Sequence, residues 1–94
     1  MDDVAIPAFA YPDGVLAREV DGEMVLLNLS SEQYYSLDRV GADIVTRLTR
    51  DPMDEAITAL CRDYDVDADE LKEDVDSLVE ELVEAGLLER AQSR

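Results

Sequence analysis

A change of hydrophobic period at Asp38 constrains the fold of this chain more than any other feature. Residues 33–37 (Gln-Tyr-Tyr-Ser-Leu) alternate in side-chain direction and are rich in aromatic residues, which is typical of a β-strand. Beyond Asp38, a favoured helix N-cap, Val40, Ile44 and Leu48 recur every four positions. This spacing predicts a helix that packs back on the sheet. The sequence therefore predicts a strand-to-helix corner at the centre of the fold.

Upstream of this corner, a β-hairpin is predicted around Asp21-Gly22, a dipeptide suited to the positive φ angles of a two-residue turn. The strands of this hairpin would be residues 15–20 and 23–29. Alternation in the second run predicts three residues that face the core: Val25, Leu27 and Leu29. Met24 and Asn28 would then face outward. A second turn at residues 30–32 would lead into the strand at 33–37, at the edge of a three-stranded antiparallel meander.

Two further helices are predicted after the first. Asp51-Pro52 ends one helix and starts the next, because proline disfavours helical geometry in the residue before it. Asp67 with Glu70 resembles a capping box, and Gly86 ends the third helix. The stripe of that helix is Leu71, Val75, Leu78, Val79, Leu82 and Val83. We predict an α+β, winged-helix-like fold, in which a three-stranded antiparallel β-meander precedes three α-helices. The expected organisation is an N-terminal arm (1–12), one domain (13–90) and a C-terminal tail (91–94).

The composition excludes several function classes. A chain of 94 residues supports one small domain. Its 24 acidic and 8 basic residues give a formal net charge of −16, which repels nucleic-acid phosphates and anionic membrane surfaces. With no histidine and one cysteine, the usual zinc and base-catalysis arrangements are absent, and Cys61 is expected to be a buried structural thiol. We predict no enzymatic activity, no cofactor and no metal. Without a signal-like or membrane-spanning apolar run, we expect a cytoplasmic protein.

The residues around Asp38 resemble a known family. The pattern consists of Val25-Leu26-Leu27-Asn28-Leu29, then Tyr35-Ser36-Leu37-Asp38-Arg39-Val40-Gly41-Ala42-Asp43-Ile44, and a closing Leu48. It is similar to the PqqD-like proteins, which are peptide recognition elements for ribosomally made, modified peptides. The resemblance covers roughly residues 15–88. Asp38 stands where the family more often has asparagine, and either residue can cap a helix.

The resemblance implies a non-catalytic module that holds the leader segment of a precursor peptide while a separate enzyme acts on it. Chains of this length resemble the standalone leader-binding subunits of lasso-peptide biosynthesis, which work beside a cysteine-protease-like leader peptidase. Others in the family resemble the peptide chaperone of quinone-cofactor biosynthesis, which serves a radical SAM enzyme. We therefore expect a leader peptide and one of these two enzymes as partners.

The predicted edge strand suggests how such a peptide would bind. An extended peptide can add to unpaired backbone groups at a sheet edge while alternate side chains enter a neighbouring pocket. Tyr35 and Leu37 would face the core, and Tyr34 and Ser36 the opposite side. The third helix would flank the strand, and its nine acidic residues against one lysine between positions 67 and 84 would attract a basic leader. The candidate peptide-binding residues are Gln33, Tyr34, Tyr35, Ser36, Leu37, Glu70, Leu71, Asp74, Val75 and Leu78.

Other interpretations stay open at this point. For Leu71, Val75 and Leu78, an ordinary core stripe is favoured over a groove, because apolar stripes at helical spacing usually belong to the core. The acidic helix can equally be a solvated face. Asp76-Ser77-Leu78 resembles the attachment triplet of acyl carrier proteins, which makes a carrier modified at Ser77 the alternative from another class. Its mid-helix position speaks against that alternative. Residues 65–76 resemble a calcium loop but have glutamate where that loop needs glycine.

Overall fold

The hairpin predicted around Asp21-Gly22 forms the first part of the sheet. The structure, a computed structural model, describes residues 6–91. Strands β2 (Val15–Val20) and β3 (Glu23–Asn28) pair antiparallel, and φ is 55° at Asp21 and 83° at Gly22. Strand β4 (Tyr34–Leu37) pairs antiparallel with the other side of β3, so the order is β2-β3-β4. The predicted meander is confirmed.

The predicted facing of the middle strand is wrong. Met24 and Leu26 are buried, whereas Val25 and Leu29 are exposed and Leu27 is half-buried. The register explains the reversal, because β3 residues share a face with the β4 residues opposite them. Leu26 lies opposite Tyr35, and Met24 lies opposite Leu37, which faces the core as predicted.

Asn28 also lies on the inner side of the sheet, against the prediction that it faces outward. Its side-chain Nδ2 donates a hydrogen bond of 2.9 Å to the carbonyl of Gly86, at the far end of the chain. Its Oδ1 accepts from the backbone N–H groups of Ser30 and Ser31, at 2.9 and 3.1 Å. Asn28 therefore holds the second turn and connects it to the end of the last helix.

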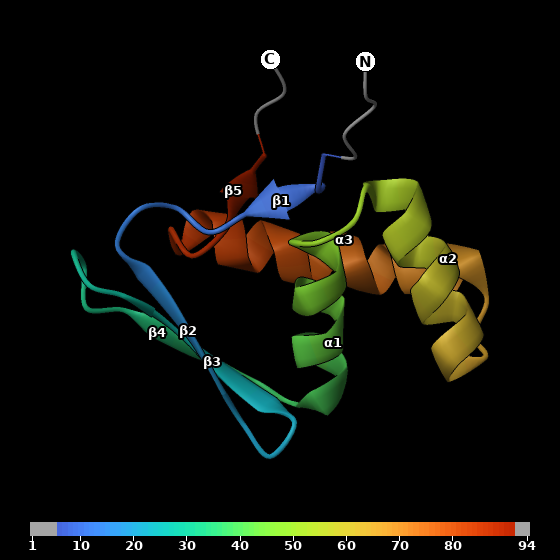
Figure 1. Cartoon of the computed structure of the whole chain (residues 1–94), viewed down its shortest axis with the longest axis horizontal. Coiled ribbons are helices and arrows are strands. Elements are labelled where there is room, and N and C mark those ends of the chain that lie inside the picture. The colour runs from blue at the N-terminus through green and yellow to red at the C-terminus, as the bar shows by residue number, and fades with distance from the viewer. Residues whose placement is uncertain (1–5, 92–94) are drawn as a thin grey trace.

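Strand β4 runs directly into helix α1 (Arg39–Leu48), as Figure 1 shows. The Asp38 carboxylate accepts a 2.9 Å hydrogen bond from the N–H of Gly41, which confirms the predicted cap. A Cβ atom on Gly41 would lie 3.2 Å from Cδ2 of Leu37, so glycine allows the end of the strand to pack on the first helical turn. The corner predicted at Asp38 is therefore formed by a side-chain cap and a close contact together.

Only part of the predicted inner face of α1 is buried. Ile44 and Leu48 lie in the core, together with Val45, which was not assigned to that face. Val40 was predicted to pack inward but is 45% exposed. A four-residue spacing drifts around a helix of 3.6 residues per turn, so the first member of such a series reaches the margin of the buried face.

Helix α2 (Met53–Tyr64) begins directly after Pro52 as predicted, and helix α3 (Ala68–Glu84) spans the molecule behind α1 and α2 (Figure 1). The capping box predicted at Asp67 does not form, since the Asp67 side chain makes no cap hydrogen bond. Its backbone carbonyl accepts the first intrahelical hydrogen bond, from Leu71 N–H at 3.0 Å, as the carbonyl of any N-cap residue does. Gly86 has the predicted positive φ of 74°.

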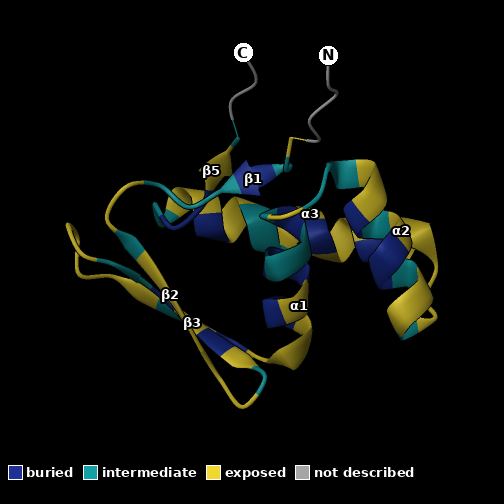
Figure 2. Ribbon diagram, in the orientation of Figure 1, coloured by how far each residue is buried: buried dark blue, intermediate teal, exposed yellow. Residues whose placement is uncertain are grey.

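The core lies where the three helices and the inner side of the sheet meet, while most of the β2–β3 hairpin projects away from the helices (Figures 1 and 2). Leu82, Leu87 and Leu88 are fully buried, so the segment after α3 folds back over the core as its sequence indicates. Among the described residues, no helix is long and apolar enough to cross a membrane.

Part of the expected N-terminal arm belongs to the folded structure. Strand β1 (Phe9–Ala10) pairs antiparallel with β5 (Glu89–Arg90), which places the two ends of the described chain side by side (Figure 1). Phe9 is buried, and the guanidinium carbon of Arg90 lies 5.6 Å from its ring centroid. Residues 1–5 of the arm and residues 92–94 of the tail lie outside the described part of the chain.

Candidate functional site

The free edge of β4 is the first component of the candidate site. Within residues 6–91, strand β4 pairs only with β3, so its other side has no partner strand. The Asn28 N–H donates a 2.8 Å hydrogen bond to the Gln33 carbonyl, so this position of the ladder has the register of a hydrogen-bonded pair. Such pairs recur at every second residue of an antiparallel ladder, so Tyr35 and Leu37 also bond to β3. The N–H and C=O groups of Tyr34 and Ser36 therefore point to the free edge.

The side chains of β4 alternate as predicted. Tyr34 is 70% exposed and Ser36 is exposed on the outer side, whereas Leu37 is buried and Tyr35 is half-buried on the inner side. The Tyr35 hydroxyl donates a short hydrogen bond to the Glu81 carboxylate of α3, and this bond raises the pKa of Tyr35 above its ordinary 10.0. The hydrogen bond connects the inner side of the edge strand to the third helix.

An apolar pocket beside the end of β4 is the second component. It has a volume of about 240 Å³ and lies between the three helices. Its lining residues come from α1, α2, α3 and the loop before α3, and they are Val40, Ile44, Leu60, Tyr64, Val66, Glu70, Leu71 and Asp74. Val40 follows the last residue of β4 by three positions, so the pocket reaches the helix start that is joined to the edge strand. We refer to these lining residues as the apolar pocket.

The rim of the apolar pocket is acidic. Glu70 and Asp74 are exposed on the first half of α3, one helical turn apart. Tyr64, on the opposite side, donates a short hydrogen bond to the Asp43 carboxylate, and this bond raises the pKa of Tyr64 above 10.0. A side chain with an apolar stem and a positive end would match an apolar pocket with carboxylates at its mouth.

The structure brings some of the predicted helix residues together and separates others. Glu70, Leu71 and Asp74 line the apolar pocket, although Leu71 is largely buried. Val75 is 0% exposed and is part of the core, so its side chain is not accessible to a guest. Leu78 is half-buried against the core. Glu81 of α3 bonds directly to β4, through the hydroxyl of Tyr35, and the sequence did not identify it.

Sequence reasoning also missed the contributions of α1 and α2 to the pocket. Val40 was assigned to the core, and Tyr64 and Val66 were assigned no role. The signal that could have identified Val66 is an apolar residue isolated between Asp65 and Asp67. Nothing in the local sequence indicates that this residue lies opposite Val40, since the packing of the three helices decides it.

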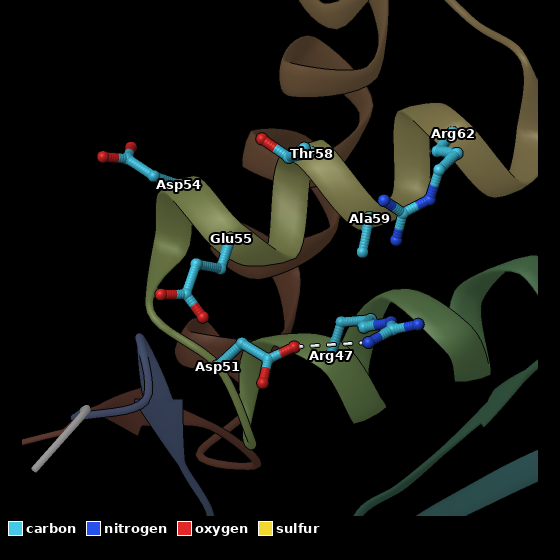
Figure 3. Close-up of a pocket in the computed structure, with 7 residues that line it drawn as sticks. All are labelled: Arg47, Asp51, Asp54, Glu55, Thr58, Ala59 and Arg62. Carbon is cyan, nitrogen blue, oxygen red and sulfur yellow. Dashed lines mark hydrogen bonds and ion pairs between the residues drawn. The ribbon is translucent and has the colours of Figure 1, made fainter.

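A second, larger pocket of about 430 Å³ lies between α1 and α2 (Figure 3). Its lining combines acidic and basic side chains, among them Glu55 and Arg62. Arg47 forms ion pairs of 3.4 Å with Asp51 and 3.5 Å with Asp63, so its charge is balanced by carboxylates of the protein itself. This pocket lacks the apolar lining that would anchor a ligand. Within residues 6–91, no three His, Cys, Asp or Glu side chains are grouped as a metal ion would require.

The chain is similar to two solved structures and to one family model. A solved structure described as TbiB1 in complex with the TbiA(beta) leader peptide is 31% identical, with a TM-score of 0.78 over 84% of this chain and 93% of that one. Another, described as lasso peptide synthetase B1 complexed with the leader peptide, is 28% identical, with a TM-score of 0.78 over 86% of this chain and 96% of that one. No curated protein matches the chain. The model of the family described as coenzyme PQQ synthesis protein D (PqqD) matches residues 23–88. The chain therefore belongs to the PqqD family.

Proposed function

We propose that this protein binds the leader segment of a ribosomally made precursor peptide, as a fourth strand on the free edge of β4, and presents it to a separate enzyme. The observation that carries this proposal is the unpaired edge at Tyr34 and Ser36 beside the apolar pocket. Both solved relatives are described as complexes with leader peptides, which supports a leader as the guest. The protein acts by binding and takes no part in bond chemistry.

Backbone pairing would supply the sequence-independent part of recognition. Tyr34 and Ser36 each offer one donor and one acceptor at the edge, so a guest strand can form several main-chain hydrogen bonds. Gln33 and the inner residues Tyr35 and Leu37 hold the strand in register against β3. The guest would therefore bind in an extended conformation.

Side-chain selectivity would come from the apolar pocket and its rim. An apolar guest residue would enter between Val40 and Val66, and a basic guest residue would pair with Glu70 or Asp74. On α3, Leu71 and Val75 support the apolar pocket from the core, and Leu78 continues this side of the helix toward Glu81. Because the rim carboxylates are exposed, the basic contribution should weaken as salt concentration rises.

The experiment compares Ser36→Pro with Ser36→Ala in a titration of fluorescein-labelled synthetic leader, followed by fluorescence anisotropy. Proline removes the outward N–H and places its ring at the edge, a position where edge strands tolerate it. Alanine keeps the N–H. We expect micromolar or tighter binding for the wild type and for Ser36→Ala, and a loss of about tenfold or more for Ser36→Pro.

Circular dichroism of both variants would confirm that the sheet is retained. Equal leader affinity for folded Ser36→Pro and Ser36→Ala would exclude strand addition at this edge. A wild-type protein that binds no leader peptide encoded near it would exclude the proposed function altogether.

The relatives of this chain also suggest which enzyme receives the leader. A cysteine-protease-like leader peptidase of a lasso-peptide pathway is favoured, because both solved relatives match over more than nine-tenths of their own length and one is described as a lasso peptide synthetase subunit. The alternative is a radical SAM enzyme, as the family's description in coenzyme PQQ synthesis suggests. Leader cleavage by the peptidase, accelerated by this protein, would distinguish the two.

A further inference from the structure

The outer side of the sheet, opposite the core, is an exposed apolar surface. Its cross-strand rows follow from the register, with Leu16 and Tyr34 flanking Leu27, and Arg18 and Ser36 flanking Val25. Val20 continues the surface toward the hairpin turn. We call Leu16, Arg18, Val20, Val25, Leu27 and Tyr34 the outer sheet face. Leu16 and Val20 are 55% and 61% exposed, although leucine and valine favour burial.

The outer sheet face is also poor in charge. About one third of the residues in this chain are charged, with a formal net charge of −16. On this side of the described strands the charged side chains are Arg18 and Glu23, which have opposite signs. The centre of a protein interface typically has few charged residues and is rich in apolar, aromatic and arginine side chains. In a sheet with one side in water, each strand alternates apolar residues toward the core with polar residues toward the solvent.

The size of the face and the charge of the chain together limit which partner can occupy the face. Three strands of this length cover about 20 Å by about 15 Å, or about 300 Å², whereas a stable interface uses about 800 Å² per partner. Two copies would also bring together two chains of net charge −16. A partner that contacts this face must therefore find additional surface elsewhere.

The bound leader would supply part of that surface, about 100 Å² for a strand about 5 Å wide and about 20 Å long. The side chains of Tyr34 and Ser36 lie on the outer side of the sheet, while their backbone groups form the free edge. A guest strand added at this edge would widen the same face by about 5 Å and contribute every second side chain to it. A protein docked here would touch the leader and this chain at once.

We propose that the outer sheet face is the docking surface for the enzyme that acts on the bound leader, through an apolar, charge-poor patch of that enzyme. This inference rests on the proposed function and adds where the enzyme binds. It requires leader binding and enzyme binding to reinforce each other. It also requires that residues of β2, two strands away from the edge, affect enzyme binding without affecting leader binding.

The experiment uses the purified leader peptidase encoded beside this chain, with its catalytic cysteine replaced by alanine so that the leader stays intact. Its dissociation constant for the immobilised full chain is measured by biolayer interferometry, with and without saturating synthetic leader. The variants are Leu16→Glu on the face and Thr58→Glu, which adds the same charge at an exposed position of α2. Val20→Glu is a second face variant in case Leu16→Glu does not fold.

We expect the leader to tighten enzyme binding about fivefold or more, and Leu16→Glu to weaken it about tenfold or more, with Thr58→Glu within about twofold of the wild type. Labelled leader should bind Leu16→Glu as it binds the wild type. Unchanged enzyme binding by folded face variants would overturn the inference while leaving the proposed function intact. A wild-type dimer in sedimentation that Leu16→Glu dissociates would also overturn it, because a second copy would then occupy the face.

Discussion

Replacing Val40 with aspartate tests whether the apolar pocket anchors the leader. Val40 lies in the first turn of α1 at the edge of the pocket and is 45% exposed. Full burial of a valine side chain contributes about 1.5–3 kcal/mol, so a guest that covers the exposed half gains about 1 kcal/mol from it. Aspartate removes this gain and adds about 1–2 kcal/mol for a carboxylate desolvated against an apolar guest. We expect leader affinity to fall roughly 30- to 150-fold.

The same substitution should leave the fold nearly unchanged. Position 40 is the second residue of α1, where a negative charge interacts favourably with the helix dipole by about 0.3–1 kcal/mol. This gain offsets part of the apolar contact that Val40 loses with its own neighbours. We expect the free energy of unfolding, measured with urea, to change by less than about 1 kcal/mol.

Val83 provides the matched control, because it is 44% exposed on α3 and lies outside the apolar pocket. Leader binding to Val83→Asp, measured by fluorescence anisotropy, should stay within about twofold of the wild type. Equal leader affinities for Val40→Asp and Val83→Asp would refute the assignment of the pocket. If Ser36→Pro still abolished binding in that case, the edge would be the binding site without the pocket.

Three further predictions concern the fold. Leu26→Ala should lower the free energy of unfolding by about 2–5 kcal/mol, whereas Val25→Ala should cost less than about 1 kcal/mol; comparable losses in urea unfolding would contradict the observed facing of β3. Asn28→Ala removes the bonds to Gly86, Ser30 and Ser31 and should cost about 1–3 kcal/mol in the same assay; an unchanged midpoint would mean that these bonds do not hold the turn. The pKa of Tyr35 is raised, chiefly by its hydrogen bond to Glu81, so its contribution to stability is complete below pH 10.0 and is lost as the pH rises through the raised value. The stability difference between wild type and Tyr35→Phe should therefore shrink above pH 10.0, and a difference constant from pH 8 to pH 11 would exclude the bond.

The elements that the sequence predicted correctly depend on short-range chemistry. Asp21-Gly22 favours a two-residue turn, Asp38 caps the helix that follows it, and Pro52 precedes the first turn of α2. Each of these signals acts within a few residues of itself. Asp67 is the N-cap residue of α3, as its position predicts, but its side chain makes no hydrogen bond to the first helical turn.

The candidate site also combines features that depend on neighbouring residues with features that depend on helix packing. Alternation along residues 34–37 was sufficient to place Tyr34 and Ser36 outward and Leu37 inward. The pocket required the relative positions of three helices, so Val40 and Val66 were missed and Val75 was assigned to a surface that it does not reach. The acidic rim could be predicted, because Glu70 and Asp74 lie outside the apolar stripe of α3.

By itself, the sequence determined the order of the three meander strands and the three helices, the turn and cap positions, and the acidic character of the third helix, because propensity, capping and charge are properties of neighbouring residues. It did not indicate β1 and β5, which pair the two ends of the described chain. Only the tertiary structure decided which side of β3 faces the core. Both alternating sets of residues on that strand, Met24 with Leu26 and Val25 with Leu27, are apolar. The register with β4 therefore determines which set is buried. The same choice leaves the other apolar set on the outer sheet face, where it is available to a partner.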